Sequence, residues 1–151
     1  MSQEQAVSVV RGFLEALRKS DVGKALSFFS DDGSWETPNG TFRGPQELRQ
    51  YLTWLAQTSG DPTITESGIG LRVVEGGEAV TIAFVEHALG GTVGGKKWEV
   101  LGMCAYELRE GKIRNARTVY DRLTVANQVT KGWLAKSVVR GVVRRMERGL
   151  R

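Results

Sequence analysis

The sequence contains a single cysteine and a single histidine among its 151 residues. Cys104 cannot form a disulfide within the chain, which is typical of a reducing compartment, and we expect a cytoplasmic location. One histidine with scattered carboxylates provides too few ligands for a zinc or iron site. We therefore expect no metal, and no pattern in the sequence calls for another cofactor.

Several other signals are also missing. No apolar run approaches the roughly 20 residues that cross a bilayer, and the first residues, "MSQEQAVSVV", lack the features of a signal peptide. "GGTVGGKKW" lacks the Lys-Ser/Thr ending of a phosphate-binding loop, and no serine nucleophile elbow is present. We expect one globular domain without these chemistries.

The net charge of +4 is unevenly distributed. Residues 129–151 hold seven basic residues against Glu147 alone, a charge of +6, so the preceding residues sum to −2. The basic character belongs to this C-terminal segment. Because the body is slightly acidic and contains no recognised reading module, we expect no binding to nucleic acid.

Hydrophobic periodicity divides the chain into two parts. Helical spacing predicts a helix over residues 3–19, a short second helix that Ser20 or Asp21 caps and that ends near Phe29, and a third helix that Pro45 opens. Later segments are rich in β-branched and aromatic residues, which predicts strands over residues 63–74, 79–89, 97–109 and 112–124.

Glycine-bearing turns separate the predicted strands. "EGGE" (75–78) and "REGK" (109–112) indicate tight hairpins, and "GGTVGG" (90–95) a longer, mobile loop. "SDDGSW" is typical of a turn before a short strand over residues 34–37. Helices followed by an antiparallel meander predict an α+β domain, in which one curved sheet wrapped by three helices leaves an apolar hollow for a ligand.

Two stretches resemble the SnoaL-like branch of the NTF2-like superfamily: "VVRGFLEALRKSDVGKALSFFSDDGSWETPNGTFRGPQELRQYL" and "LREGKIRNARTVYDRL". The resemblance covers about residues 4–128 and implies an α+β cone with a deep pocket. This fold carries isomerases, cyclases, hydrolases and non-catalytic binders, so the resemblance indicates the fold more strongly than the function.

The chemistries of related families place particular residues in the pocket. Similarity to ketosteroid isomerases puts Phe13 at the position of the catalytic tyrosine and Thr37 at that of the base, and neither can perform that work. Similarity to limonene-epoxide hydrolases puts His87 at the arginine position and Leu89 at the first aspartate, whereas Asp121 matches the second. An acid/base aspartate of polyketide cyclases also corresponds to Asp121.

Asp121 and His87 are accordingly the candidate catalytic residues. Asp121 shares a face of its predicted strand with Val119 and Leu123, where a carboxylate needs a partner or a role. We expect it to line the cavity with a raised pKa, facing His87; the alternative is a structural carboxylate satisfied by nearby donors. Glu86 lies on the opposite face and would replace His87 if the register shifted by one.

Other residues are candidates for shaping the pocket. The aromatic ones could contact a flat apolar ligand or simply fill the core. Either Met103 or Cys104 must face inward, and Cys104 has no evident base beside it. The expected pocket-lining residues are Phe13, Trp35, Thr37, Trp98 and Tyr120.

Residues 129–151 form a second unit beyond the expected domain of residues 1–128. Apolar residues recur every fourth position from Leu134 to Leu150, and Lys136, Arg140, Arg144 and Arg148 form a separate basic row, which predicts a basic amphipathic helix. We expect its apolar stripe to pack on the sheet or across a homodimer. The alternative is docking of residues 132–150 on an anionic membrane or an acidic partner.

Two functions remain open from the sequence. One is a pocket protein for a small, largely apolar molecule that performs cofactor-free acid/base chemistry of an isomerase, cyclase or hydrolase type. The other is a non-catalytic binding or accessory module with a docking C-terminal helix. Two or more convergent titratable groups in the pocket would favour the enzyme.

Overall fold

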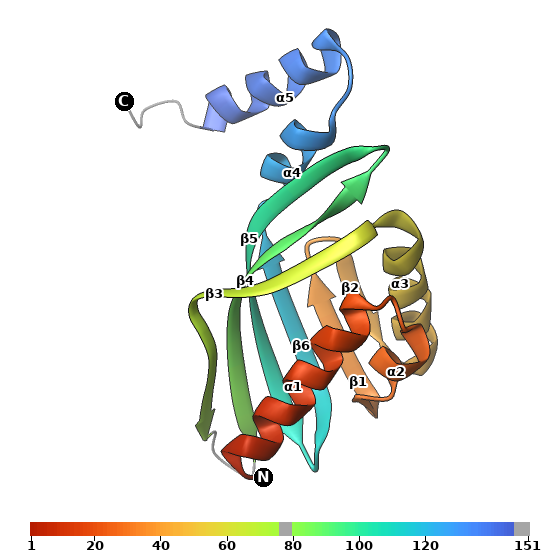
Figure 1. Ribbon diagram of the computed structural model, residues 1–151, viewed down its shortest axis with the longest axis vertical. Helices are drawn as coiled ribbons and strands as arrows, with labels where there is room; N and C mark the ends of the chain where they lie inside the picture. The colour runs from red at the N-terminus through yellow and green to blue at the C-terminus, as the bar shows by residue number, and fades with distance from the viewer. Residues whose placement is uncertain (76–79, 147–151) are drawn as a thin grey trace.

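A curved six-stranded sheet forms the body of the protein (Figure 1). The computed structural model describes residues 1–75 and 80–146, which contain five helices and six strands. The helices are α1 (Gln3–Arg18), α2 (Val22–Leu26), α3 (Gly44–Thr58), α4 (Arg122–Val129) and α5 (Trp133–Met146). The strands are β1 (Phe29–Thr37), β2 (Gly40–Arg43), β3 (Gly60–Glu75), β4 (Thr81–Val93), β5 (Lys96–Arg109) and β6 (Lys112–Tyr120). The predicted α+β class is confirmed.

The strand order β2-β1-β6-β5-β4-β3 contains one parallel pair. From β3 to β6 the strands form the expected antiparallel meander. β1, however, runs parallel to β6, with Trp35 opposite Ala116. The sheet is therefore mixed, because a strand from the helical first part of the chain pairs with the last strand.

A bulge bends the outermost long strand. The register of β3 against β4 shifts between Glu66 and Leu71. Gly68 and Gly70 within this interval have φ values of +52° and +60°, which favour glycine. Bulges increase the local twist of a strand. This one curves β3 and leaves a concave face on the side of the helices (Figure 1).

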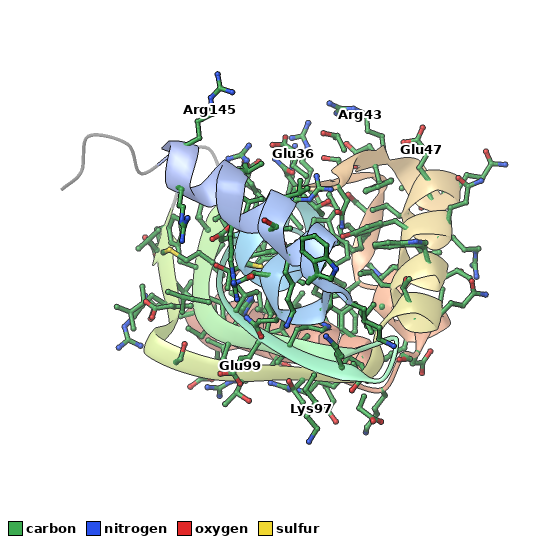
Figure 2. The ribbon with its side chains drawn as sticks, turned by 90° about the horizontal axis from the view of Figure 1, so that it is seen from above. Glu36, Arg43, Glu47, Lys97, Glu99 and Arg145 are labelled. Carbon is green, nitrogen blue, oxygen red and sulfur yellow. The ribbon has the colours of Figure 1, made fainter. Side chains whose placement is uncertain are left out.

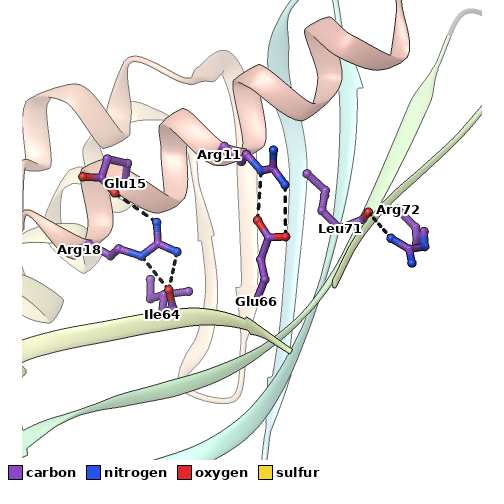
Figure 3. A network of polar contacts seen from close by, with 7 residues as sticks. All are labelled: Arg11, Glu15, Arg18, Ile64, Glu66, Leu71 and Arg72. Carbon is purple, nitrogen blue, oxygen red and sulfur yellow. Dashed lines mark hydrogen bonds and ion pairs between the residues drawn. The ribbon is translucent and has the colours of Figure 1, made fainter. Parts of the chain in front are cut away.

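Helix α1 lies across the concave face and is tied to β3 by two arginines. Ser2 caps it through a reciprocal capping box with Gln5. Near its other end, the Arg18 guanidinium donates to the Ile64 carbonyl oxygen of β3 (Figure 3). Arg11 pairs with Glu66, also on β3, with Nε 3.1 Å from Oε1. These contacts hold α1 beside the strand that bounds the cavity.

An aromatic cluster packs between α1 and the sheet. The Phe13 ring meets those of Phe29, Trp35 and Tyr106 edge to face, with centroids 5.3, 5.4 and 6.0 Å apart. Phe13 is completely buried within this cluster. Helix α1 and the two strands β1 and β5 are thus joined through one side chain.

Several predicted boundaries differ from the structure. "SDDGSW" is part of β1 and not a turn, and β4 continues through Gly90 and Gly91 to Val93, so the expected loop "GGTVGG" shrinks to a two-residue turn. β6 ends at Tyr120, four residues early, because α4 starts there. The "REGK" hairpin is confirmed, whereas residues 76–78 of the "EGGE" turn lie outside the described part of the chain.

The C-terminal helices extend beyond the cone (Figure 1). α4 packs on β5, and α5 packs on α4. The expectation that the apolar stripe of α5 packs on the sheet of its own chain is wrong for its described side chains: Val138 is 66% exposed and Val142 43% exposed. Of the helices in the described ranges, none is long and apolar enough to cross a membrane.

Candidate functional site

An apolar cavity of about 370 Å³ occupies the concave side of the sheet. Helices form one wall: the end of α1, the start of α2 and the second half of α3. The four strands β3 to β6 form the opposite wall, and α4 lies over one end. Deep residues include Leu14, Leu52, Ile64, His87, Leu89, Cys104, Tyr106 and Thr118. The cavity thus lies between the sheet and the helices.

His87 projects from β4 into this cavity wall and is only 1% exposed. It faces inward with Val85, while Glu86 turns the other way and its carboxylate accepts a hydrogen bond from the Ile69 backbone N–H. Gly102 on β5 pairs with His87, and a Cβ there would lie 3.1 Å from His87 Cδ2. Glycine thus provides the space in which the imidazole lies.

A chain of buried polar side chains leads to His87. The Trp35 indole N–H donates to Thr118 Oγ1 over 2.9 Å, Thr118 Oγ1 lies 3.1 Å from Cys104 Sγ, and Cys104 Sγ lies 3.6 Å from His87 Nε2. Indole can only donate, so the Thr118 oxygen accepts and its own hydrogen can point to Cys104. The thiol hydrogen then points to His87 Nε2.

The contacts of His87 allow two tautomers, and the arrangement above places its proton on Nδ1. Burial, together with the nearby Arg18 guanidinium, lowers the pKa of His87 to about 4, so the ring is neutral at pH 7. With Nε2 accepting from the thiol, Nδ1 carries the hydrogen. In the described part of the chain, Nδ1 is buried without a hydrogen-bond partner.

Trp98 supplies a second buried donor. Its side chain lies against β4, and a Cβ added to Gly91 would come within 3.3 Å of the indole nitrogen. The indole N–H is buried and has no partner among the described residues. Trp98 and Trp35 both line the cavity.

Tyrosines border the cavity near the β1–β2 turn. The Asn39 amide donates to the hydroxyl oxygens of Tyr51 and Tyr120, at 3.4 and 3.3 Å. Tyr120 lines the cavity. The Arg122 guanidinium donates to the Pro38 carbonyl oxygen over 2.9 Å, which ties α4 to this turn.

Asp121 does not line the cavity, contrary to the prediction. It is exposed and caps α4, where its carboxylate accepts from the Leu123 backbone N–H at 2.8 Å and from the Thr124 hydroxyl at 2.6 Å. The hydrogen bonds from Thr124 and the backbone lower its pKa, opposite to the expected direction. The strand alternation that placed it inside ends one residue earlier. The structure therefore does not join His87 and Asp121 in one hollow.

Two of the expected pocket residues also lie elsewhere. Phe13 is in the aromatic cluster and not in the cavity wall. Thr37 lies in the tight β1–β2 turn, where its hydroxyl donates to the Gly40 carbonyl and accepts from the Asn39 backbone N–H. Both were placed by their match to ketosteroid isomerases, a gapless match that depends on equal loop lengths.

The titratable groups deep in the cavity are uncharged at neutral pH. Burial raises the pKa of the Cys104 thiol and of the Tyr51 and Tyr106 hydroxyls, just as it lowers that of His87. Asp21 is the one carboxylate among the described wall residues, and it accepts from the Lys24 backbone N–H as the cap of α2. Within the described ranges, no three histidine, cysteine, aspartate or glutamate side chains gather as a metal site requires.

The series of polar side-chain contacts from Trp35 to His87 was not predicted from the sequence. Alternation on β5 required that either Met103 or Cys104 face inward, and Cys104 does so while Met103 is exposed. Thr118 lies on the same face of β6 as Ala116. An inward polar residue on each of two neighbouring strands was the available signal, but their pairing needed the register.

Comparisons with known structures support this architecture. An NTF2-like protein from Burkholderia xenovorans is 24% identical, with 86% of this chain and 99% of that chain covered and a TM-score of 0.65. A protein with a ketosteroid isomerase-like fold from Catenulispora acidiphila, solved with trimethylamine, is 16% identical, with coverages of 80% and 90% and a TM-score of 0.68. An LEH-like epoxide hydrolase from M. tuberculosis is 20% identical, with coverages of 89% and 96% and a TM-score of 0.64. These likenesses establish a shared fold.

The sequence comparisons identify the family. No curated protein matches the chain. The model of the SnoaL-like domain matches residues 10–116, which include the second half of α1, α2, α3, the strands β1 to β5 and most of β6. The chain belongs to the SnoaL-like domain family.

Proposed function

We propose that this protein binds a small, uncharged, largely apolar molecule in the cavity on the concave side of its sheet. The observation that carries the proposal is the cavity itself. Its volume of about 370 Å³ is in the range of small-molecule sites, and its wall combines apolar side chains with a few polar atoms. Because the deep titratable groups are neutral at pH 7, a charged ligand would lose its hydration without gaining an opposite charge.

Two unpartnered donors suggest how such a ligand is oriented. Trp98 Nε1–H and, in the tautomer described above, His87 Nδ1–H are buried without partners in the described residues. A buried donor left unpaired costs about 1–3 kcal/mol, so a ligand that offers an acceptor gains from either contact. We therefore propose a ligand that carries a carbonyl, ether or hydroxyl oxygen on an apolar body.

Binding is better supported than acid/base catalysis. A general base works best when its pKa is near the working pH. His87, with a pKa of about 4, is a weak base at pH 7, and the Cys104 thiol and Tyr106 hydroxyl are held protonated. The Asp121 carboxylate, which the cyclase-like and hydrolase-like chemistries would use, faces solvent as a helix cap. A cytoplasmic, non-catalytic binding protein is thus our proposal.

Native mass spectrometry of the purified full chain tests the proposal. We expect a retained small molecule, or uptake of the uncharged apolar dye Nile red in solution at one molecule per chain. Leu89→Trp would place an indole in the cavity and should abolish uptake, whereas Ile69→Trp, on the exposed part of β3, should leave it unchanged.

His87 variants separate the polar contact from the apolar volume. His87→Leu removes Nδ1 but keeps an apolar side chain, so we expect Nile red still to enter and the retained oxygen-bearing ligand to bind roughly tenfold more weakly. A folded protein that takes up neither ligand nor dye would contradict the proposal. If the unaltered chain turns over a ligand and His87→Leu does not, this result would favour an acid/base enzyme.

A further inference from the structure

Helix α5 presents an apolar surface that the chain leaves open. One side of the helix carries an exposed stripe of three apolar residues, Ala135, Val138 and Val142. A surface helix of a globular protein normally turns such a stripe to the core. In this protein α5 packs on α4, beyond the cone, so the stripe remains available to a partner (Figure 1).

The charge of the helix indicates what kind of partner fits. α5 contains Lys136, Arg140, Arg144 and Arg145 and no acidic residue. Seen from above, it crosses over the end of the cone and Arg145 points away from the body (Figure 2). A partner that complements both features offers negative charge at its surface and apolar material beneath, as an anionic lipid bilayer does.

A second copy of the chain fits this surface less well. The stripe is two turns long and consists of small side chains, whereas a stable dimer interface buries about 800 Å² on each partner. The second copy would also bring the same row of positive charges. A bilayer accepts a shallow stripe, because basic side chains on the polar face reach the headgroups.

The position of α5 connects it to the cavity. α4 covers one end of the cavity with Val125 and Val129, and α5 follows it through Gly132, whose φ is +86°. Lys96 on β5 secures this joint, because its ammonium group donates to the Thr130 carbonyl oxygen at 3.0 Å. A surface that binds α5 therefore comes to lie beside the α4 end of the cavity.

We propose that α5 docks this end of the protein on an anionic lipid bilayer, so that an apolar ligand passes between the bilayer and the cavity beneath α4. The docking is independent of the cavity's occupant, and the ligand transfer rests on the proposed function. Apolar molecules concentrate in the bilayer, so docking shortens their path through water.

Vesicle flotation of the full chain tests the docking. We expect binding to vesicles of phosphatidylcholine with 30% phosphatidylglycerol, at least tenfold weaker binding to phosphatidylcholine alone, and weakening as salt rises. Val138→Asp/Val142→Asp should abolish binding, and Arg140→Glu/Arg144→Glu should weaken it at least tenfold. The matched pairs Ile69→Asp/Val74→Asp and Arg49→Glu/Arg72→Glu, which lie on α3 and β3, should bind like the unaltered chain.

Three outcomes would overturn the docking: no binding to anionic vesicles, equal binding to neutral ones, or binding that the stripe variant retains. A dimer that dissociates with Val138→Asp/Val142→Asp, without vesicle binding, would assign the stripe to a second copy instead. Nile red separates the two proposals. Both proposals hold if dye enters the unaltered chain and the stripe variant equally from solution, but moves from anionic vesicles faster into the unaltered chain. If no dye enters from solution, the proposed function fails while the docking is judged by flotation.

Discussion

At the scale of single residues, the burial of His87 should be visible in the pH dependence of stability. An unfolded histidine has a pKa near 6.5, and that of His87 in the folded protein is about 4. Between these values the unfolded chain binds a proton that the folded chain does not. The free energy of unfolding therefore falls as the pH falls through this window, by up to about 3 kcal/mol for this group.

Denaturant unfolding of the unaltered chain and of His87→Gln at pH 7.5, 6.5, 5.5 and 4.5 would measure this term. We expect the unaltered chain to lose more stability than the variant between pH 6.5 and 4.5, because glutamine does not titrate. The carboxylates with lowered pKa values, such as Glu66 and Glu36, affect both proteins alike and act at lower pH. Parallel curves for the two proteins would contradict a buried neutral His87.

At the scale of an element, Asp121 is the cap of α4. Replacing an aspartate cap with alanine removes an acceptor for the first backbone N–H groups and costs about 1 kcal/mol. We expect Asp121→Ala to lower the free energy of unfolding by this amount and Asp121→Asn, which can still cap, to have a smaller effect. Denaturant unfolding of the three proteins measures this difference.

The same variants also test the role that family resemblance gives to Asp121. Its carboxylate is directed to Leu123 and Thr124 and not to the cavity. We therefore expect ligand and dye uptake by Asp121→Asn to equal that of the unaltered chain. Loss of uptake in a stable Asp121→Asn protein would show that this carboxylate contacts the ligand.

At the scale of the whole molecule, the outer face of the sheet carries an exposed apolar patch. Leu101, Met103 and Val119 are each about half exposed, and Met103 lies directly opposite Val119 across the β5–β6 pair. Phe84 on β4 extends the patch. Contiguous exposed apolar surface of this kind marks interaction sites, and we expect a homodimer through this face.

Light scattering across a range of protein concentrations would detect this dimer. We expect Leu101→Glu/Val119→Glu to give a monomer at concentrations where the unaltered chain is dimeric, because two carboxylates would be buried without partners. Ile69→Glu, on an exposed part of β3, is the control and should remain dimeric. A single monomeric mass for the unaltered chain at every concentration would contradict the expectation.

Sequence reasoning succeeded where the deciding interactions are local. Helical spacing predicted α1, Pro45 and the spacing after it predicted α3, and alternation placed His87 inward with Val85. It failed at Asp121, because alternation continues only as long as the strand does. The four residues beginning at Asp121 satisfy their hydrogen bonds as the first turn of a helix. Aspartate is a preferred N-cap residue, which was the available signal for that cap.

The α+β class, the family and the basic amphipathic end of the chain were thus already determined by the order of residues, because propensity and periodicity act over short distances. The tertiary structure decided three other features. They are the parallel pairing of β1 with β6, the series of polar contacts from Trp35 through Thr118 and Cys104 to His87, and the open stripe of α5. Each depends on the register and packing of segments far apart in the sequence. Trp35 and Thr118 are 83 residues apart, and only the folded sheet brings them within hydrogen-bond distance.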